Sequence, residues 1–221
     1  DGYSFFSNTL KFSGIGESRV AERINDLLNL KNPTVAPYAK LGEVKLRITA
    51  KAKSELEANK LIKPVKEKIK NEFSKFIFGE NDDTLPGVLI KELAKRKETI
   101  VFAESCTGGL LSSSITSISG SSQVFLGSIV SYSNDLKNSL LNISEEKLKK
   151  YGAVSEKVCQ TMSTNVKEKL GADWAIAISG IAGPKGGSEG KPVGLVHISI
   201  SGPNNHITNI KKIFNSTRNR I

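Results

Sequence analysis

The sequence predicts an α/β protein, a three-layer α/β/α sandwich with a mainly parallel sheet and an antiparallel edge hairpin, preceded by a small α+β domain. Two observations lead to this prediction. From residue 85 onward, short apolar runs rich in β-branched residues alternate with helical patterns, which is typical of a parallel sheet covered by helices on both faces. The last two runs, 193–201 and 207–214, are separated by a short turn segment and predict a hairpin at the sheet edge.

A polar segment divides the chain. Residues 79–83 read Gly-Glu-Asn-Asp-Asp and show no apolar periodicity, so they predict a domain boundary. Residues 1–80 are expected to form the small α+β domain and residues 85–221 the α/β domain, each folding separately. Because the chain begins with Asp1 and ends in what reads as the start of an element, we expect a fragment of a longer protein.

The front-domain elements follow from periodicity. Val44, Leu46 and Ile48 alternate with polar residues, as in a half-buried strand, and Ser54 is placed to cap a long helix. In order, the predicted elements are a strand over 5–12, a turn at 14–16, a helix over 17–30, an extended piece between Pro33 and Pro37, a strand over 43–50 and a helix from 54 toward 76.

The second domain alternates helices and strands. The predicted elements are a helix over 85–97, a strand over 99–103, a helix over 109–117, a strand over 124–132, helices near 144–150 and 155–170, a strand over 173–179, a glycine loop and the final hairpin. In sheets of this kind, ligands gather at the carboxyl ends of the strands, beside helix N-termini.

The formal net charge of +10 is spread along the chain. Up to Pro86 there are 15 basic and 12 acidic residues, and from Gly87 onward there are 17 and 10. The densest basic run, 60–75, alternates with apolar residues at helical spacing and contains Glu67 and Glu72, which is typical of a solvated helix face. Charge alone therefore accounts for solubility as readily as for a nucleic-acid site.

Cysteine usage and hydropathy indicate a cytoplasmic protein. Cys106 and Cys159 form no disulfide framework, and together with the two histidines they show no metal-ligand spacing. No apolar run approaches the length of a membrane helix, and no signal peptide opens the chain. We expect neither a metal nor a cofactor.

The strongest candidate site is centred on Ser105. An apolar run over 99–103 is followed by Glu104-Ser105-Cys106-Thr107-Gly108-Gly109, and a helical pattern then begins. Free backbone N–H groups at a helix N-terminus can hold an oxyanion or a phosphate, and glycines let a ligand approach the backbone. The competing interpretation is a simple helix cap, which is the commonest role of a serine in this position.

A serine nucleophile needs a group that takes its proton. Both histidines are poor candidates, since His197 lies within a predicted strand and His206 follows a turn. Burial can lower the pKa of a lysine until its amine acts as a base, and a tyrosine can relay or stabilise the proton, so Lys137 and Tyr132 are the candidates. Lys137 could equally be an ordinary surface lysine.

Two further features carry weaker signals. Cys106 is a competing nucleophile because a helix N-terminus lowers a thiol pKa, but no base pairs with it by sequence. The glycine-rich run 180–187 follows a strand and suits a phosphate or a close-packed ligand, although it is not a Walker loop and could be a mobile surface loop.

Six motifs occur along the second domain. They are Ala103-Glu104-Ser105-Cys106-Thr107-Gly108-Gly109, Gly120-Ser121-Ser122, Tyr132-Ser133-Asn134-Asp135-Leu136-Lys137, Gly152-Ala153-Val154-Ser155, Gly180-Ile181-Ala182-Gly183-Pro184 and Lys191-Pro192-Val193-Gly194. In these residues the chain from 85 to its end closely resembles the C-terminal domain of the CinA family, the nicotinamide-nucleotide amidases. Through its segments 14–18, 33–39 and 44–50, the front half resembles the linking domain of long members. Such members begin with a molybdopterin-binding-like domain associated with ADP-ribose pyrophosphatase activity, which is not carried over to this sequence.

The resemblance implies hydrolysis of nicotinamide mononucleotide to nicotinate mononucleotide and ammonia, in pyridine nucleotide salvage, by a homodimer without metal or cofactor. By position, Ser105 would be the nucleophile, Lys137 its base and Tyr132 a proton-relay or stabilising partner. Backbone N–H groups around residues 106–108 would hold the oxyanion. The implied binding residues are Cys106, Thr107, Gly108, Gly109, Gly180, Ala182, Gly183 and Arg218.

Departures from the family pattern and alternative functions complete the prediction. Ser179 stands where the family usually has Thr, and Arg218 fits the first arginine of a basic tail whose second would lie past Ile221. The family name comes from a link to competence and DNA recombination, so the alternative is a non-catalytic binding protein for DNA or recombination proteins; a third is a degenerate amidase fold that binds a partner. With no Gly-x-x-Gly clamp between helices, the front domain is interpreted as a structural or dimerisation piece.

Overall fold

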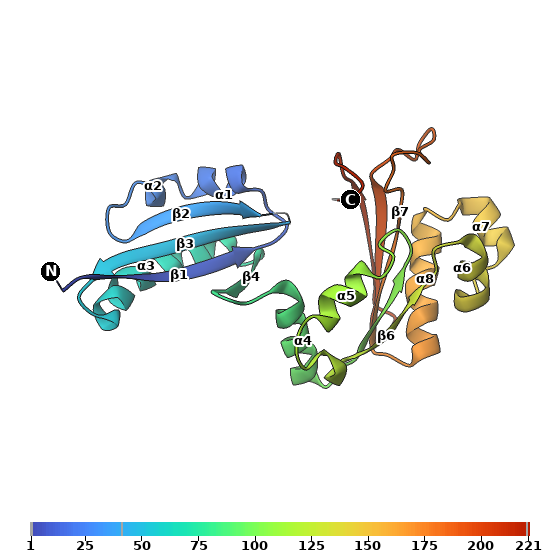
Figure 1. Cartoon of the computed structure of the whole chain (residues 1–221), viewed down its shortest axis with the longest axis horizontal. Coiled ribbons are helices and arrows are strands. Elements are labelled where there is room, and N and C mark those ends of the chain that lie inside the picture. Colours follow the sequence, from blue (N-terminus) through green and yellow to red (C-terminus); the bar gives the residue numbers. More distant parts are fainter. Residues whose placement is uncertain (1, 41, 220) are drawn as a thin grey trace. The chain divides into compact units, whose positions relative to one another are not determined.

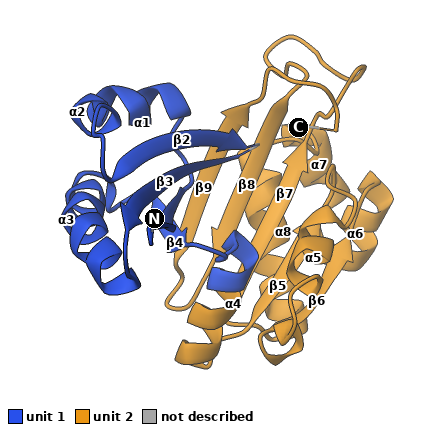
Figure 2. Cartoon of the chain, turned by 60° about the vertical axis from the view of Figure 1, so that its left-hand side comes forward, with its two compact units in different colours: residues 1–88 blue, residues 89–221 orange. Residues whose placement is uncertain are grey.

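The computed structural model describes residues 2–40, 42–219 and 221. The chain divides into two compact units, Asp1–Val88 (unit 1) and Leu89–Ile221 (unit 2), which Figure 2 shows in blue and orange. The fold class is confirmed as α/β, with a small α+β unit followed by an α/β/α unit (Figure 1). No helix in the described ranges is long and apolar enough to cross a membrane.

Unit 1 is an antiparallel sheet packed against three helices. Its elements are β1 (Ser4–Phe12), α1 (Glu17–Arg23), α2 (Asn25–Leu28), β2 (Thr34–Lys40), β3 (Glu43–Ala52), α3 (Glu55–Phe73) and β4 (Ile77–Glu80), and the strand order is β2-β3-β1-β4. Every second residue of β3, from Val44 to Ala52, is buried, as period-two alternation predicts for a sheet with one covered face. These side chains form one core with Val20 and Leu27 of the short helices and Ile62 and Ile69 of α3.

Two predictions for unit 1 were wrong in detail. The helix expected over 17–30 is broken at Ile24, whose backbone leaves the helical region (φ −118°, ψ 23°), and it ends at Leu28. The turn lets Ile24 and Leu27 both reach the core, so packing overrides continuous helical hydrogen bonding here. The segment 79–83, expected to be an irregular boundary, begins inside β4, because Gly79 and Glu80 pair with Lys11 and Leu10 of β1.

Unit 2 contains a five-stranded mixed sheet. Its elements are α4 (Leu85–Arg96, which starts in unit 1), β5 (Ile100–Glu104), α5 (Leu110–Thr116), a 3-10 turn η1 (Ser121–Gln123), β6 (Phe125–Val130), α6 (Asn134–Leu141), α7 (Glu145–Tyr151), α8 (Glu156–Leu170), β7 (Trp174–Gly180), β8 (Leu195–Ser201) and β9 (Ile207–Ile213). The order is β6-β5-β7-β8-β9, with β6, β5 and β7 parallel. The hairpin β8–β9 forms the predicted antiparallel edge.

Helices cover both faces of this sheet, which confirms the three-layer arrangement (Figure 2). Alternate residues of β5 point to opposite layers: Val101 and Ala103 pack with α6, α7 and α8, whereas Ile100 and Phe102 pack with α4 and α5. Because β5, β6 and β7 are parallel, their carboxyl ends meet at one edge of the sheet. The segments that follow these three strands therefore lie close together.

Helix α6 was not predicted. Ser133 caps it by accepting a hydrogen bond from the Leu136 N–H at 3.1 Å, and Asp135 lies in its first turn, where a negative charge favours the helix dipole. The cap residue and the 3.6-residue spacing of Leu136 and Leu140 are signals that could have identified it. This helix matters because it carries Lys137.

Candidate active site

Ser105 follows the central strand β5 directly. Its backbone N–H donates to the carbonyl of Ile178 on β7 at 3.0 Å, which continues the sheet hydrogen bonding by one residue and fixes the serine at the strand end. Ser105 is 8% exposed. The side chain therefore sits in a sheltered position at the edge where ligands of parallel sheets usually bind.

Lys137 reaches Ser105 from α6. Its Nζ lies 3.0 Å from Ser105 Oγ, 2.8 Å from the carbonyl oxygen of Ser131 and 3.2 Å from that of Tyr132. The alternative that Lys137 is a surface residue is wrong, since only 1% of it is exposed. The predicted Ser105 and Lys137 pair is thus brought into direct contact by two elements that are 32 residues apart in sequence.

The environment of Lys137 favours a neutral amine. Burial lowers the pKa of Lys137, because the charged form loses its hydration. Among the described residues, no carboxylate forms an ion pair with this lysine. Two of the contacts are carbonyl oxygens, which can only accept hydrogen bonds, so a neutral Nζ donates its two protons to them. Its lone pair is then left for the hydroxyl proton of Ser105.

Glu104 holds the segment that follows Ser105. This carboxylate is fully buried and accepts hydrogen bonds from the backbone N–H groups of Gly109 and Leu111, both at 3.0 Å, and from the N–H and hydroxyl of Ser112 at 2.9 and 2.5 Å. Burial opposes ionisation, but the hydrogen bonds, that of the Ser112 side chain first, outweigh it and lower the pKa of Glu104. Glu104 therefore ties the start of α5 to the end of β5.

Replacing Glu104 by alanine is expected to destabilise unit 2 by roughly 3 kcal/mol or more, because three backbone N–H groups lose their acceptor. The melting temperature measured by circular dichroism should fall by about 10 °C. Since the pKa of Glu104 is lowered in the folded chain, its contribution is present above the pKa of an unfolded glutamate and is lost as the pH falls through the folded value. An unchanged melting temperature at neutral pH would contradict this role.

Not every backbone N–H group of the turn over residues 105–109 is available to hold an oxyanion. The N–H of Gly108 donates to the Ser105 carbonyl at 3.1 Å, and that of Gly109 is bound by Glu104, so both are in use. The expected oxyanion donors are the backbone N–H groups around residues 106–108. Of these, the N–H groups of Cys106 and Thr107 have no hydrogen-bond partner in another described residue. Gly108 and Gly109 instead allow the turn to form, with φ values of +59° and +105° that other residues rarely adopt.

The Cys106 thiol is harder to ionise than a free thiol. Burial raises the pKa of the Cys106 thiol, which opposes formation of the reactive thiolate. Its Sγ packs near Gly180, where an added Cβ would come within 3.1 Å of the sulfur and 2.9 Å of the Leu195 carbonyl oxygen. Gly180 is therefore required for close packing and is not among the pocket-lining residues.

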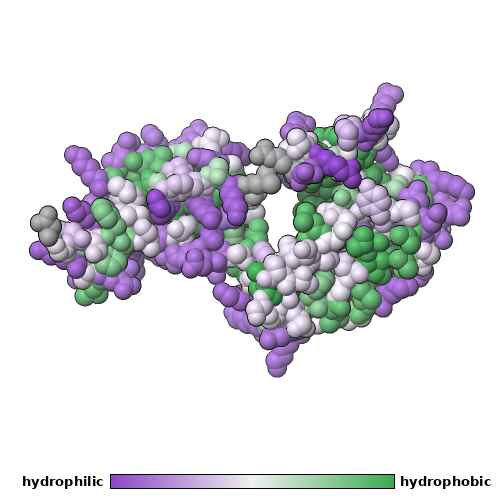
Figure 3. Space-filling view, viewed as in Figure 1, coloured by the Kyte–Doolittle hydropathy of each residue, from purple (hydrophilic) through white to green (hydrophobic). Residues whose placement is uncertain are grey.

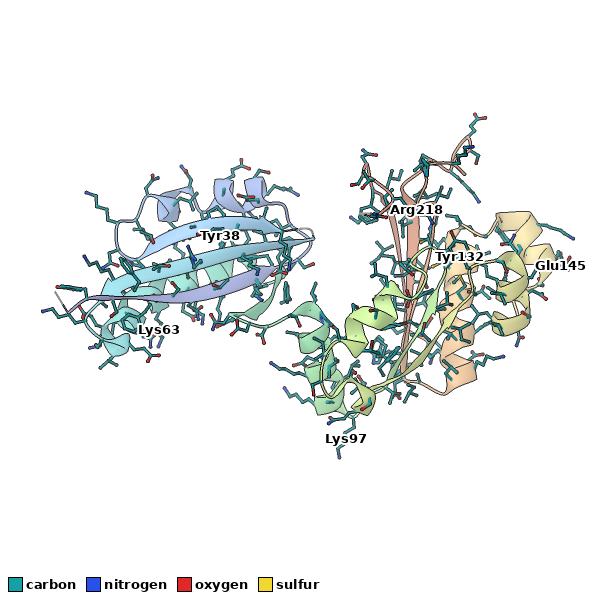
Figure 4. All side chains as sticks on the ribbon, in the orientation of Figure 1. Tyr38, Lys63, Lys97, Tyr132, Glu145 and Arg218 are labelled. Atoms are coloured by element: carbon teal, nitrogen blue, oxygen red, sulfur yellow. The ribbon has the colours of Figure 1, made fainter. Side chains whose placement is uncertain are left out.

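A pocket of about 340 Å³ opens at the turn that follows Ser105, and neither Ser105 nor Lys137 is among the residues that line it. It is lined by Cys106, Thr107, Leu110, Ala182, Arg218, Asn219 and Ile221. The Arg218 guanidinium donates to the Gly183 carbonyl at 2.6 Å and to the Tyr132 hydroxyl at 3.2 Å, and Figure 4 shows the two side chains facing one another. Tyr132 is 59% exposed and is not among the residues that line the pocket. Its hydroxyl contacts Arg218, and the expected relay contact with Ser105 or Lys137 is not formed.

The remaining candidates fall outside the reacting pair. His197 lies in β8, as predicted, and His206 is exposed beyond the β8–β9 turn. Ser179, in the place of the family's usual Thr, is fully buried and its hydroxyl donates to the Ala153 carbonyl at 2.8 Å. No group of three or more metal-binding side chains occurs within the described part of the chain.

Comparison with known proteins places this site in a family. Residues 82–221 match the model of the CinA C-terminal domain, and residues 7–79 match that of the damage-inducible protein CinA KH domain. The chain is 90% identical over all its 221 residues to a CinA-like protein of Prochlorococcus marinus strain MIT 9312, of which it covers 52%. It is 50% identical over 97% of its length to a CinA-like protein of Trichormus variabilis, again covering 52%.

Solved structures agree with these matches. The competence/damage inducible protein CihA from Agrobacterium tumefaciens has a TM-score of 0.60 and 36% identity, covering 61% of this chain and 82% of that one. A CinA superfamily protein from Escherichia coli has a TM-score of 0.59 and 31% identity, covering 61% and 78%. The chain spans about half the length of the curated relatives it matches. With one family model covering residues 82–221, the chain belongs to the CinA family.

Proposed function

We propose that unit 2 is a serine/lysine amidohydrolase that converts nicotinamide mononucleotide to nicotinate mononucleotide and ammonia. The observation that carries this proposal is the buried, unpaired amine of Lys137 at 3.0 Å from Ser105 Oγ. A buried lysine without a carboxylate partner costs stability, so its presence beside a hydroxyl calls for a function. The substrate itself is inferred from the family resemblance.

Acylation begins with proton transfer. The neutral Nζ of Lys137 takes the hydroxyl proton of Ser105 as Oγ attacks the carboxamide carbon, and the carbonyl oxygen becomes an oxyanion. The N–H groups of Cys106 and Thr107 are available to stabilise that charge. The protonated Lys137 then gives its proton to the departing nitrogen, and ammonia leaves.

Deacylation repeats these roles with water. Lys137 takes a proton from water, the resulting hydroxide attacks the acyl carbon, and the proton returns to Ser105 Oγ as the ester bond breaks. The product is the carboxylate of nicotinate mononucleotide. No step passes through a metal or a cofactor. In the pocket, the Arg218 guanidinium offers charge to the substrate phosphate, and the Tyr132 hydroxyl accepts a hydrogen bond from that guanidinium.

The alternative of a non-catalytic binding protein needs no buried amine beside Ser105, so the geometry favours the enzyme. From the resemblance, we further propose a cytoplasmic homodimer. Neither the location nor the homodimer changes the proposed reaction, because Ser105 and Lys137 lie in the same chain.

The test is product formation from nicotinamide mononucleotide in the presence of a chelator. We expect ammonia and nicotinate mononucleotide in equal amounts, measured by a coupled assay and by chromatography. Nicotinamide riboside, which lacks the phosphate, should show a higher KM because it cannot pair with Arg218. Absence of both products from nicotinamide mononucleotide would overturn the proposal for this chain.

A further inference from the structure

The sheet of unit 1 has one covered and one open face. The residues of β3 that alternate with its buried side chains point away from the helices, and their exposure ranges from partial to full. The neighbouring residues of β1 and β2 are brought beside them by antiparallel pairing: Phe5 pairs with Lys51, Thr9 with Arg47 and Tyr38 with Lys45. The open face is made of these residues, and α3 lies behind it in the view of Figure 1.

The open face is basic. Strands β1, β2 and β3 contain one acidic residue, Glu43, which lies 3.9 Å from Lys45. The accessible cations of the face are Lys40, Lys45, Arg47 and Lys51, joined by Lys53 just after β3. Lys11, which pairs with Lys45, is buried and donates to the Asp83 carbonyl. On α3, three of the five lysines are paired with acids: Lys66 and Lys70 with Glu80, and Lys68 with Asp26. Arg47 and Lys51 of the sheet have no ion pair with an acidic residue of the described strands, so this face carries net positive charge.

Aromatic rings lie among these cations. Tyr3, Phe5 and Tyr38 are 49%, 73% and 44% exposed. The Arg47 guanidinium lies 4.9 Å from the Tyr38 ring centroid and hydrogen-bonds the Tyr38 hydroxyl, and the Nζ of Lys51 lies 5.3 Å from the Tyr3 ring. Figure 3 shows this side of unit 1 as hydrophilic residues with hydrophobic ones among them. A depression of about 420 Å³ is lined by Thr9, Tyr38, Ala39, Lys40, Lys45 and Arg47.

We propose that the open face of unit 1 binds single-stranded nucleic acid. Exposed rings and a planar guanidinium can stack with bases, and the lysines can pair with phosphates. The seven residues from Lys45 to Lys51 span roughly 20 Å along β3, enough for a short strand of a few nucleotides. Hydroxyls between the two ends, including the hydrogen-bonded pair Ser7 and Thr49, add polar contacts without base selectivity.

The helical side of unit 1 does not offer an equivalent site. A KH domain clamps the backbone of a nucleic acid with a Gly-x-x-Gly loop between two helices. Here α1 and α2 are joined at Ile24 alone, within the sequence Glu22-Arg23-Ile24-Asn25, so that clamp is not present. A second copy of the chain is also disfavoured as the occupant, because two identical basic faces would repel one another. The sequence-based interpretation of unit 1 as a structural or dimerisation piece stays a prediction, and the sedimentation measurement below bears on it.

Fluorescence anisotropy with labelled oligo(dT) and oligo(U) of twelve nucleotides tests this proposal on the 221-residue chain. Four uncompensated cations predict that affinity falls roughly 50-fold between 50 and 200 mM salt. Arg47→Glu/Lys51→Glu is expected to weaken binding at least about 10-fold. Tyr38→Ala should weaken it about 5-fold, whereas Tyr38→Phe should retain affinity because the ring remains.

The matched control is Lys60→Glu/Lys63→Glu, which changes the net charge equally on the exposed side of α3 (Figure 4 labels Lys63). This variant should bind within about 2-fold of the original chain. Absence of binding, or equal loss in both double variants, would overturn the proposal. So would a change in oligomeric state caused by the sheet substitutions, measured by sedimentation, since the face would then be an interface between copies. All these variants should release ammonia at an unchanged rate.

Discussion

Replacing Ser105 by alanine is expected to lower the rate of ammonia release from nicotinamide mononucleotide by about four orders of magnitude or more. Alanine leaves the turn and the Lys137 amine in place but removes the atom that forms the acyl bond. Water could reach the carboxamide only without covalent assistance. The measurement is kcat/KM for ammonia release, together with mass spectrometry, which should find an acylated chain only when Ser105 is present.

The matched control is Ser113→Ala, an exposed serine on α5, which should keep full activity. Ser105→Ala should also retain its melting temperature, because the hydroxyl has one hydrogen-bond partner, Lys137, and that amine keeps its two carbonyl contacts. A Ser105→Ala protein with more than about a tenth of the original activity would rule out the serine as nucleophile and redirect attention to Cys106.

The position of Ser105 at the end of a buried strand was predictable from the sequence for a physical reason. A short run of buried β-branched residues followed by small and hydroxyl-bearing ones marks a strand end, and that pattern is local. The sheet and its edge hairpin follow from the same kind of signal, which explains why the strands of unit 2 agree with the prediction although helix α6 was missed. Glu104 was part of the motif but received no role, because its four hydrogen bonds run to residues five to eight positions later, in a turn whose shape is set by tertiary packing.

The burial of Lys137 is the part that the sequence could not decide, because it offered this lysine as a base and left a surface position equally open. Whether a lysine is solvated or buried depends on what packs around it, and here that is the meeting of β5, β6 and α6 at the sheet edge. The open face of unit 1 likewise depends on tertiary structure that the sequence does not show. Alternation identifies which residues of β3 share a face, but only the pairing register brings Tyr38, Arg47 and Phe5 onto it together.

Replacing Lys137 by methionine should lower kcat/KM for nicotinamide mononucleotide by about three to four orders of magnitude, since the side-chain volume is kept while the base is lost. Lys149→Met, at an exposed lysine on α7, is the control and should be fully active. Lys137→Arg distinguishes a base from a mere positive charge, because arginine stays protonated at every usable pH. Activity in Lys137→Arg comparable to that of the original chain would show that Lys137 acts only as a charge.

The pH dependence of kcat/KM should show that the neutral form of Lys137 is the active one. Below the pKa of Lys137 the amine is protonated and cannot accept the Ser105 proton, so kcat/KM should rise with pH and reach a plateau once the amine is neutral. Because burial lowers this pKa, the plateau should begin below the range of an ordinary lysine. The unfolded chain binds more protons at this site than the folded one, so stability should also rise with pH between the folded pKa and that of a free lysine. Activity and stability therefore share one titration, and Lys137→Met should lose its contribution to both pH profiles.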